Sequence, residues 1–96
     1  MYGLIGKMLA TEGNRSELAK ILINGVAGMP GCLSYVVAED KSDGNALWIT
    51  EVWVDQEHHT ASLQLPSVQD AIAQGRPLIA GFGERFETTP LGGYGI

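Results

Sequence analysis

The side chains best suited to proton transfer and to binding an aromatic ligand lie close together in the chain. Glu51 and Trp53 are soon followed by His58 and His59. A carboxylate or an imidazole can take a proton from a bound substrate, and a tryptophan can line an apolar cavity for an aromatic ring. Adjacent residues on a helix point about 100° apart, so the two histidines cannot both face one cavity or ligate one metal ion. We take His59 as a candidate for proton transfer. A surface or helix-packing role is the alternative for both histidines.

Residues 46–54 are rich in β-branched and aromatic types, which predicts a strand whose side chains alternate between two faces. One face carries Leu47, Ile49, Glu51 and Trp53, and the other carries Trp48, Thr50, Val52 and Val54. Glu51 is either a buried carboxylate with a raised pKa, suited to a general base, or an ion-pair partner for Arg76 or Arg85. The ion pair is the simpler interpretation. Trp53 either lines a cavity or anchors a core or an interface.

Tyr35 and Cys32 belong to the preceding β-rich run. The phenol of Tyr35 could donate a hydrogen bond to a substrate, although packing with a solvated hydroxyl explains the residue equally well. Cys32 follows a turn and has no histidine pattern nearby, so we expect a small buried residue rather than a nucleophile. The glycines form no phosphate-binding loop, because no glycine-rich motif follows a strand and opens a helix.

Hydrophobic periodicity and the positions of glycine and proline predict the elements that hold these residues. In chain order they are a strand over residues 2–9, a helix over 14–27, an antiparallel hairpin of strands 32–39 and 46–54, a helix over 55–65, a short helix over 67–74 and a last strand over 83–89. Asn14 is expected to cap the first helix, with Glu17 completing a capping box. The order is that of a ferredoxin-like α+β fold, βαββαβ, with an antiparallel sheet in one domain over residues 1–96.

Composition and charge narrow the possible partners. The net charge of −5, with six Lys and Arg scattered along the chain, leaves no basic stripe for nucleic acid. No stretch is long and apolar enough to cross a membrane, and a single cysteine without a signal-peptide pattern predicts a cytoplasmic setting. Both faces of the strand over 46–54 are apolar, and a sheet face without helices needs a cover. We therefore predict a homodimer with Trp48 or Val52 in its interface.

Three features resemble the antibiotic biosynthesis monooxygenase family and its quinol-monooxygenase relatives. They are Pro30-Gly31-Cys32, the Glu51-Val52-Trp53 triplet on a strand, and the helix over residues 55–66 that follows at once. Together with the element order, the resemblance extends over nearly the whole chain. It implies a dimeric α+β barrel with a pocket between the sheet and the helices of each subunit. It also implies oxidation of a phenolic or quinol substrate by dioxygen without a cofactor or a metal.

The resemblance makes Glu51 and His59 the candidate catalytic residues, and Trp53, Tyr35 and Ser62 the candidate substrate-binding residues. Family members commonly carry a histidine nine residues beyond the tryptophan, followed by a Thr-Pro-His stretch. This chain has Ser62 and Leu65-Pro66-Ser67 there, and His59 lies about one helical turn before Ser62. A non-catalytic binding or sensing module of the same fold is therefore one alternative, and an isomerase or another small-metabolite enzyme is a second.

Overall fold

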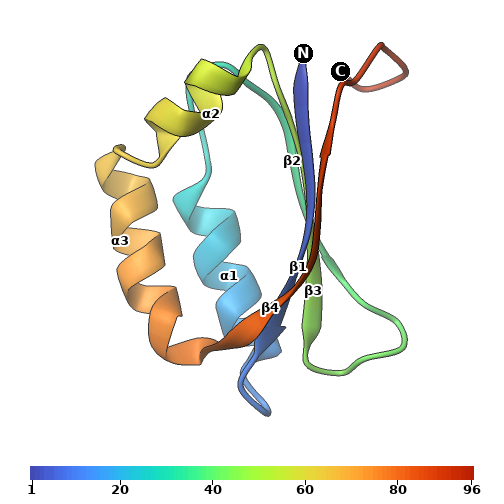
Figure 1. Ribbon diagram of the computed structural model, residues 1–96. Coiled ribbons are helices and arrows are strands. Elements are labelled where there is room, and N and C mark those ends of the chain that lie inside the picture. The colour runs from blue at the N-terminus through green and yellow to red at the C-terminus, as the bar shows by residue number, and fades with distance from the viewer.

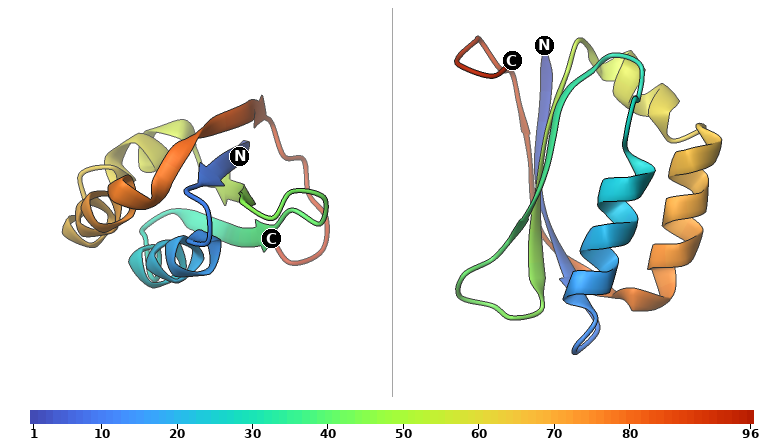
Figure 2. Two further views of the ribbon diagram at one scale, coloured as in Figure 1. Left: turned by 90° about the horizontal axis from the view of Figure 1, so that it is seen from below. Right: turned by 180° about the vertical axis from the view of Figure 1, so that it is seen from behind.

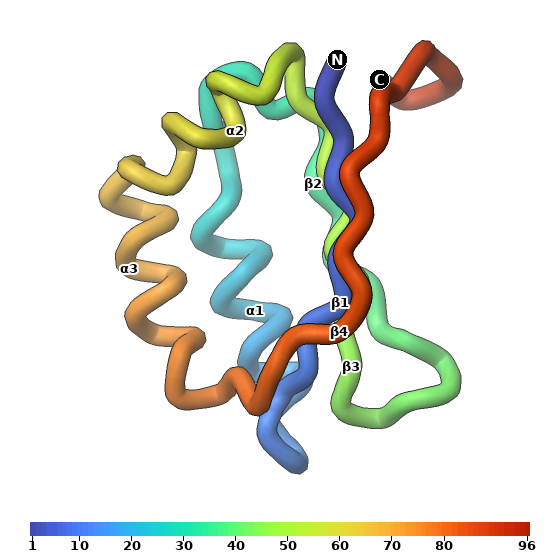
Figure 3. The backbone as a smooth tube through the Cα atoms, viewed as in Figure 1, coloured from blue at the N-terminus to red at the C-terminus, as the bar shows by residue number.

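Four strands and three α-helices make up the computed structural model, which describes residues 1–96 (Figure 1). They follow in the order β1 (Tyr2–Ala10), α1 (Arg15–Gly25), β2 (Cys32–Glu39), β3 (Ala46–Trp53), α2 (Gln56–Ser62), α3 (Pro66–Gly75), a 3₁₀ turn η1 (Arg76–Leu78), and β4 (Ile79–Thr88). The strands form one antiparallel sheet in the order β2-β3-β1-β4. The edge strand β4 runs beside β1, so the two chain ends lie at the same end of the sheet (Figure 3). The predicted ferredoxin-like α+β fold is confirmed.

The side of the sheet that faces the helices carries the core. The predicted alternation along β3 is present, because Leu47, Ile49 and Trp53 are buried. Leu18 of α1 packs with Leu47 in one cluster, and Val68 of α3 packs with Trp53 in a second. Full burial of an aliphatic side chain contributes about 1.5–3 kcal/mol, so these contacts hold both helices against the sheet.

The other face of the sheet has no helix over it (Figure 2). Trp48 and Val52 of β3 are only half-buried on this face. Phe86 of β4 is exposed and lies opposite Ile5 of β1, which places it on the same face. The apolar character that the sequence predicted for both faces of β3 is present. On this side no helix covers it, and Lys7 Nζ lies 5.7 Å from the centre of the Trp48 ring.

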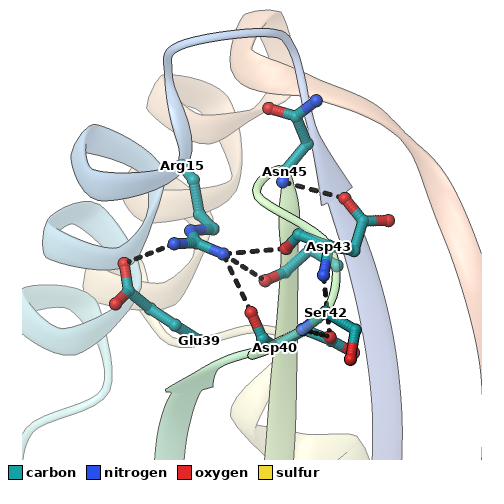
Figure 4. Close-up of polar contacts among 7 residues, drawn as sticks. Arg15, Glu39, Asp40, Ser42, Asp43 and Asn45 are labelled. Atoms are coloured by element: carbon teal, nitrogen blue, oxygen red, sulfur yellow. Dashed lines mark hydrogen bonds and ion pairs between the residues drawn. The ribbon is translucent and has the colours of Figure 1, made fainter.

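Arg15, in the first turn of α1, ties the β2–β3 connection to the helix (Figure 4). Its guanidinium donates to the carbonyl oxygens of Asp40 at 3.2 Å and Asp43 at 2.8 Å, and pairs with the carboxylate of Glu39 at 3.0 Å. Within the connection, the carboxylate of Asp40 accepts the backbone N–H of Ser42 at 2.7 Å. These bonds satisfy turn carbonyls that would otherwise depend on water, and they give a rather long hairpin loop a fixed shape.

Two predictions of local structure are wrong. Asn14 stands at the N-cap of α1 but makes no capping bond, since its side-chain amide donates to Thr11 Oγ1 at 2.8 Å, and so no capping box forms with Glu17. The last strand begins at Ile79 rather than at residue 83, because its backbone already pairs with β1 opposite Ala10. Long-range pairing here prevails over the weak strand preference of Ala and Gly. None of the helices is long and apolar enough to cross a membrane.

Candidate active site

A cavity of about 160 Å³ lies between the sheet and the three α-helices. Its wall is mostly apolar, with side chains such as Leu22, Met29 and Val68. It also includes all five residues singled out from the sequence, namely Tyr35, Glu51, Trp53, His59 and Ser62. Strands β2 and β3 supply the first three of these, and α2 supplies the other two. The fold therefore brings the five side chains, which come from three separate elements, to one partly open cavity.

Glu51 and Trp53 reach the cavity because residues two apart on a strand share a face. The indole Nε1–H of Trp53 donates to Glu51 Oε1 at 3.0 Å. Trp53 is fully buried, and the side chain of Glu51 is 15% exposed. The tryptophan thus holds the carboxylate in one orientation, with a small part of it still accessible.

The start of α2 decides which histidine faces the cavity. The carboxylate of Asp55 caps the helix by accepting the backbone N–H of His58 at 2.8 Å, and the same oxygen lies 2.6 Å from His58 Nδ1. His58 is thereby held at the surface, and His59, one residue on, turns inward. His59 Nε2 lies 3.9 Å from Glu51 Oε1, and its ring meets the indole of Trp53 edge-on at a centroid distance of 5.5 Å.

Burial raises the pKa of Glu51, and the opposing effects of the Trp53 hydrogen bond and the nearby positive charges do not cancel it. The predicted ion pair with Arg76 or Arg85 is wrong, because the only cationic side chain within 4.0 Å of Glu51 is His59. Arg85 lies on β4, with β1 between it and β3, and Arg76 lies in η1. Glu51 is therefore the buried carboxylate of the alternative interpretation, with a pKa moved towards the range in which a general base works best.

Tyr35 and Cys32 both keep their protons. Burial, followed by the nearby charge of Glu51, raises the pKa of the Tyr35 phenol well above its usual range. Burial also raises the pKa of the Cys32 thiol, which donates to the carbonyl oxygen of Ser34 at 3.6 Å. Tyr35 is thus a hydrogen-bond donor at the cavity wall, and Cys32 has the protonated state expected of a residue that is not a nucleophile.

A second hollow, which we call the Gly6 cleft, adjoins the cavity and was missed from the sequence. It has a volume of about 280 Å³ and shares Met8, Tyr35 and Glu51 with the cavity. Its further lining includes Leu4, Gly6, Ile49, Phe82 and Arg85. These residues come from β1, β3 and β4, so the cleft depends on three strands being adjacent. No local pattern in the sequence reports that adjacency.

Comparisons with known proteins agree with this architecture. The family model for antibiotic biosynthesis monooxygenases matches residues 1–74. The chain belongs to the antibiotic biosynthesis monooxygenase family. A crystal structure of a family protein from Chloroflexus aurantiacus J-10-fl is 65% identical, covers 99% of this chain and 97% of its own, and superposes with a TM-score of 0.97. A second crystal structure, from Deinococcus radiodurans, is 25% identical, covers 100% of this chain and 98% of its own, and has a TM-score of 0.79. A search of curated proteins finds no match.

Membership of the antibiotic biosynthesis monooxygenase family supports a generic monooxygenase-like role. It also bears on Ser62, where the resemblance led us to expect histidine. Ser62 is buried at the cavity wall, and its hydroxyl donates to the carbonyl oxygen of His59 at 2.6 Å. His59 reaches the same cavity from three residues earlier on α2, because positions three apart share a helix face. No group of three or more His, Cys, Asp or Glu side chains is arranged to hold a metal ion.

Proposed function

We propose that this antibiotic biosynthesis monooxygenase family member oxidises a small aromatic or quinol substrate with dioxygen, without a cofactor, and that Glu51 is the general base. The observation that carries the proposal is a carboxylate with a raised pKa on the wall of an apolar cavity, beside His59 and Trp53. Apolar walls bind an aromatic ring, and a poised base favours the ionised form of its hydroxyl.

The reaction needs little more from the protein than this deprotonation. Glu51 takes the proton of a substrate hydroxyl, and the resulting anion passes one electron to dioxygen. The two radicals combine to form a carbon–oxygen bond at a ring position that carries hydrogen. Loss of water then leaves a quinone. One oxygen atom of dioxygen stays in the product, and the other leaves as water with the hydroxyl hydrogen and the ring hydrogen of the substrate.

His59 has a supporting part in this scheme. Its Nε2 lies 3.9 Å from the Glu51 carboxylate, and its side chain is 17% exposed, so it has access both to the base and to solvent. A small movement of either side chain would bring the two groups within hydrogen-bond reach. His59 then helps to return the proton held by Glu51 to the oxygen atom that leaves as water.

The sharpest test of the proposed base is Glu51→Gln, which keeps the shape of the side chain and an oxygen that can accept from Trp53. Oxygen uptake with a dihydroxyaromatic substrate should fall roughly 10²-fold or more in this variant. Glu57→Gln is the matched control, because Glu57 is an exposed carboxylate at the start of α2. A Glu51→Gln enzyme that keeps the wild-type rate would exclude Glu51 as the base.

A second function, a binding or sensing module, is favoured by one observation, the serine at position 62 in place of the usual histidine. In that case the cavity binds its ligand and no chemistry follows. Saturable binding of dihydroxyaromatics to the wild type, without oxygen uptake above autoxidation in buffer, would replace the enzyme with this module.

We also propose that the chain acts as a homodimer, with a second copy covering the open face of the sheet. Trp48 and Val52 at the centre of that face, with exposed Phe86 nearby, would be removed from water in such a pair. The proposed site lies on the opposite, helix-facing side of the sheet, so pairing leaves it accessible.

A further inference from the structure

We infer that the Gly6 cleft binds the ring of the substrate and that Arg85 binds an anionic group on that ring, so that the substrate is a small aromatic acid. The inference rests on the proposed function for the reacting hydroxyl, which would face Glu51. It goes further by assigning the chemical class of the substrate and the residue that selects it.

The floor of the cleft is open because Gly6 has no side chain. A Cβ atom built on Gly6 would meet nothing within 4 Å. Gly6 pairs with Ile49 of β3 on one side and with Arg85 of β4 on the other. Glu51 lies two residues further along β3, opposite Leu4 and on the same face. A flat ring lying over Gly6 would therefore have the carboxylate of Glu51 on one flank and the guanidinium of Arg85 on the other.

Arg85 can bind an anion because its guanidinium forms no ion pair within 4.0 Å, although its charge also acts on Glu51 and on the hydroxyl of Tyr2. The ion pairs of the structure join Arg15 to Glu39, His58 to Asp55 and His59 to Glu51, and none involves Arg85. The nearest acidic neighbour along β4 on the same face, Glu87, instead accepts the hydroxyl hydrogen of Tyr2 at 2.6 Å. An unpaired guanidinium lining a cleft offers two parallel N–H groups, which match the geometry of a carboxylate.

The rest of the lining suits an aromatic ring. Phe82 is 71% exposed, an unusual state for a phenylalanine, and it borders the cleft together with Tyr35. Both residues present ring surfaces on which a planar ligand can pack. The phenol of Tyr35 retains its proton and can donate to an oxygen of the ligand.

The inference is tested by calorimetric titration, without oxygen, of two ligands of the same shape, 2,5-dihydroxybenzoate and 2,5-dihydroxybenzamide, of which only the first carries an anionic group. The wild type should bind the acid roughly 10-fold or more tightly than the amide. Arg85→Gln should remove this preference, and Arg85→Lys should keep part of it, because an ammonium lacks the two-pronged geometry. Arg76→Gln, which removes an equal charge from an exposed position outside the cleft, should bind as the wild type does.

Equal affinities of the wild type for the two ligands, no measurable binding of the acid, or an Arg85→Gln variant that keeps the preference would each overturn the inference. Oxygen uptake separates this result from the proposed function. Selective binding of the acid through Arg85 without oxygen uptake would leave the inference standing and remove the monooxygenase. Oxygen uptake that is equal for both ligands and unaffected by Arg85→Gln would support the monooxygenase and overturn the role of Arg85.

Discussion

Gly6→Val should raise the stability of the protein and weaken its affinity for the ligand. Glycine within a strand costs roughly 0.5–1 kcal/mol relative to alanine, and valine suits a strand better still. A Cβ atom on Gly6 would meet nothing within 4 Å, and its backbone lacks the positive φ that would exclude a side chain, so we expect the folded state to accept valine. The free energy of unfolding should therefore rise by about 0.5–1 kcal/mol, which for a chain of this size raises Tm by about 2–8 °C.

The same valine places three carbon atoms on the floor of the Gly6 cleft, where the ring of the ligand would lie. Forcing a ligand against side-chain carbons costs about 1–3 kcal/mol, so affinity for 2,5-dihydroxybenzoate should fall roughly 10-fold or more. Thermal unfolding and calorimetric titration measure the two effects on one sample. Gly81→Val is the matched control, since Gly81 is also a strand glycine with nothing within 4 Å of a built Cβ, but it lies outside the cleft. A stabilised Gly6→Val variant with unchanged affinity would refute the placement of the ligand.

Two further predictions concern the interface and the buried carboxylate. Sedimentation at micromolar concentration should show a species of twice the 10.2 kDa chain mass, and Val52→Asp should shift it towards monomers or unfolded chain, because the new charge would be unpaired in the contact. Ala73→Asp, on the exposed side of α3, should leave the dimer intact, and a dimer that also survives Val52→Asp would move the interface elsewhere. Because the pKa of Glu51 is raised by folding, its contribution to stability is greatest at low pH and is lost as pH rises through that pKa. In urea unfolding, the free energy of unfolding of Glu51→Gln relative to the wild type should therefore rise as the pH increases above about 4. A difference that does not change with pH would contradict the raised pKa.

The sequence was sufficient to predict those parts of the fold and site that depend on local residue patterns. The β2–β3 hairpin and the two faces of β3 follow from apolar residues at a period of two, and they place Glu51 beside Trp53. The inward turn of His59 was open in the sequence, because either of two adjacent histidines could face the sheet. The capping bond from Asp55 to His58 resolves it, since it fixes the rotation of α2 at its first turn.

The sequence was insufficient to predict features that depend on pairing between strands far apart in the chain. The early start of β4 depends on pairing with β1, which the weak strand preference of Ala80 and Gly81 does not reveal. The expected ion pair of Glu51 failed for a related reason, because Arg85 and Glu51 stand on strands separated by β1. The Gly6 cleft was missed because it also depends on strand adjacency. Gly6 leaves an open space there only because β3 and β4 flank it in the sheet.

The position of Glu51 between two hollows of different character suggests how the site works as a whole. On one side the apolar cavity removes water from the carboxylate and raises its pKa, and on the other the Gly6 cleft gives a ligand access to it. A base buried on all sides could not meet a substrate, and a fully exposed one would have the ordinary pKa of a glutamate. His59 and Ser62 lie on the cavity side, where a proton relay would operate without touching the ring of the substrate. Under the proposed function, a histidine at either of two positions on the inner face of α2 would serve such a relay. We therefore expect serine at position 62 to be compatible with catalysis when His59 stands one turn before it.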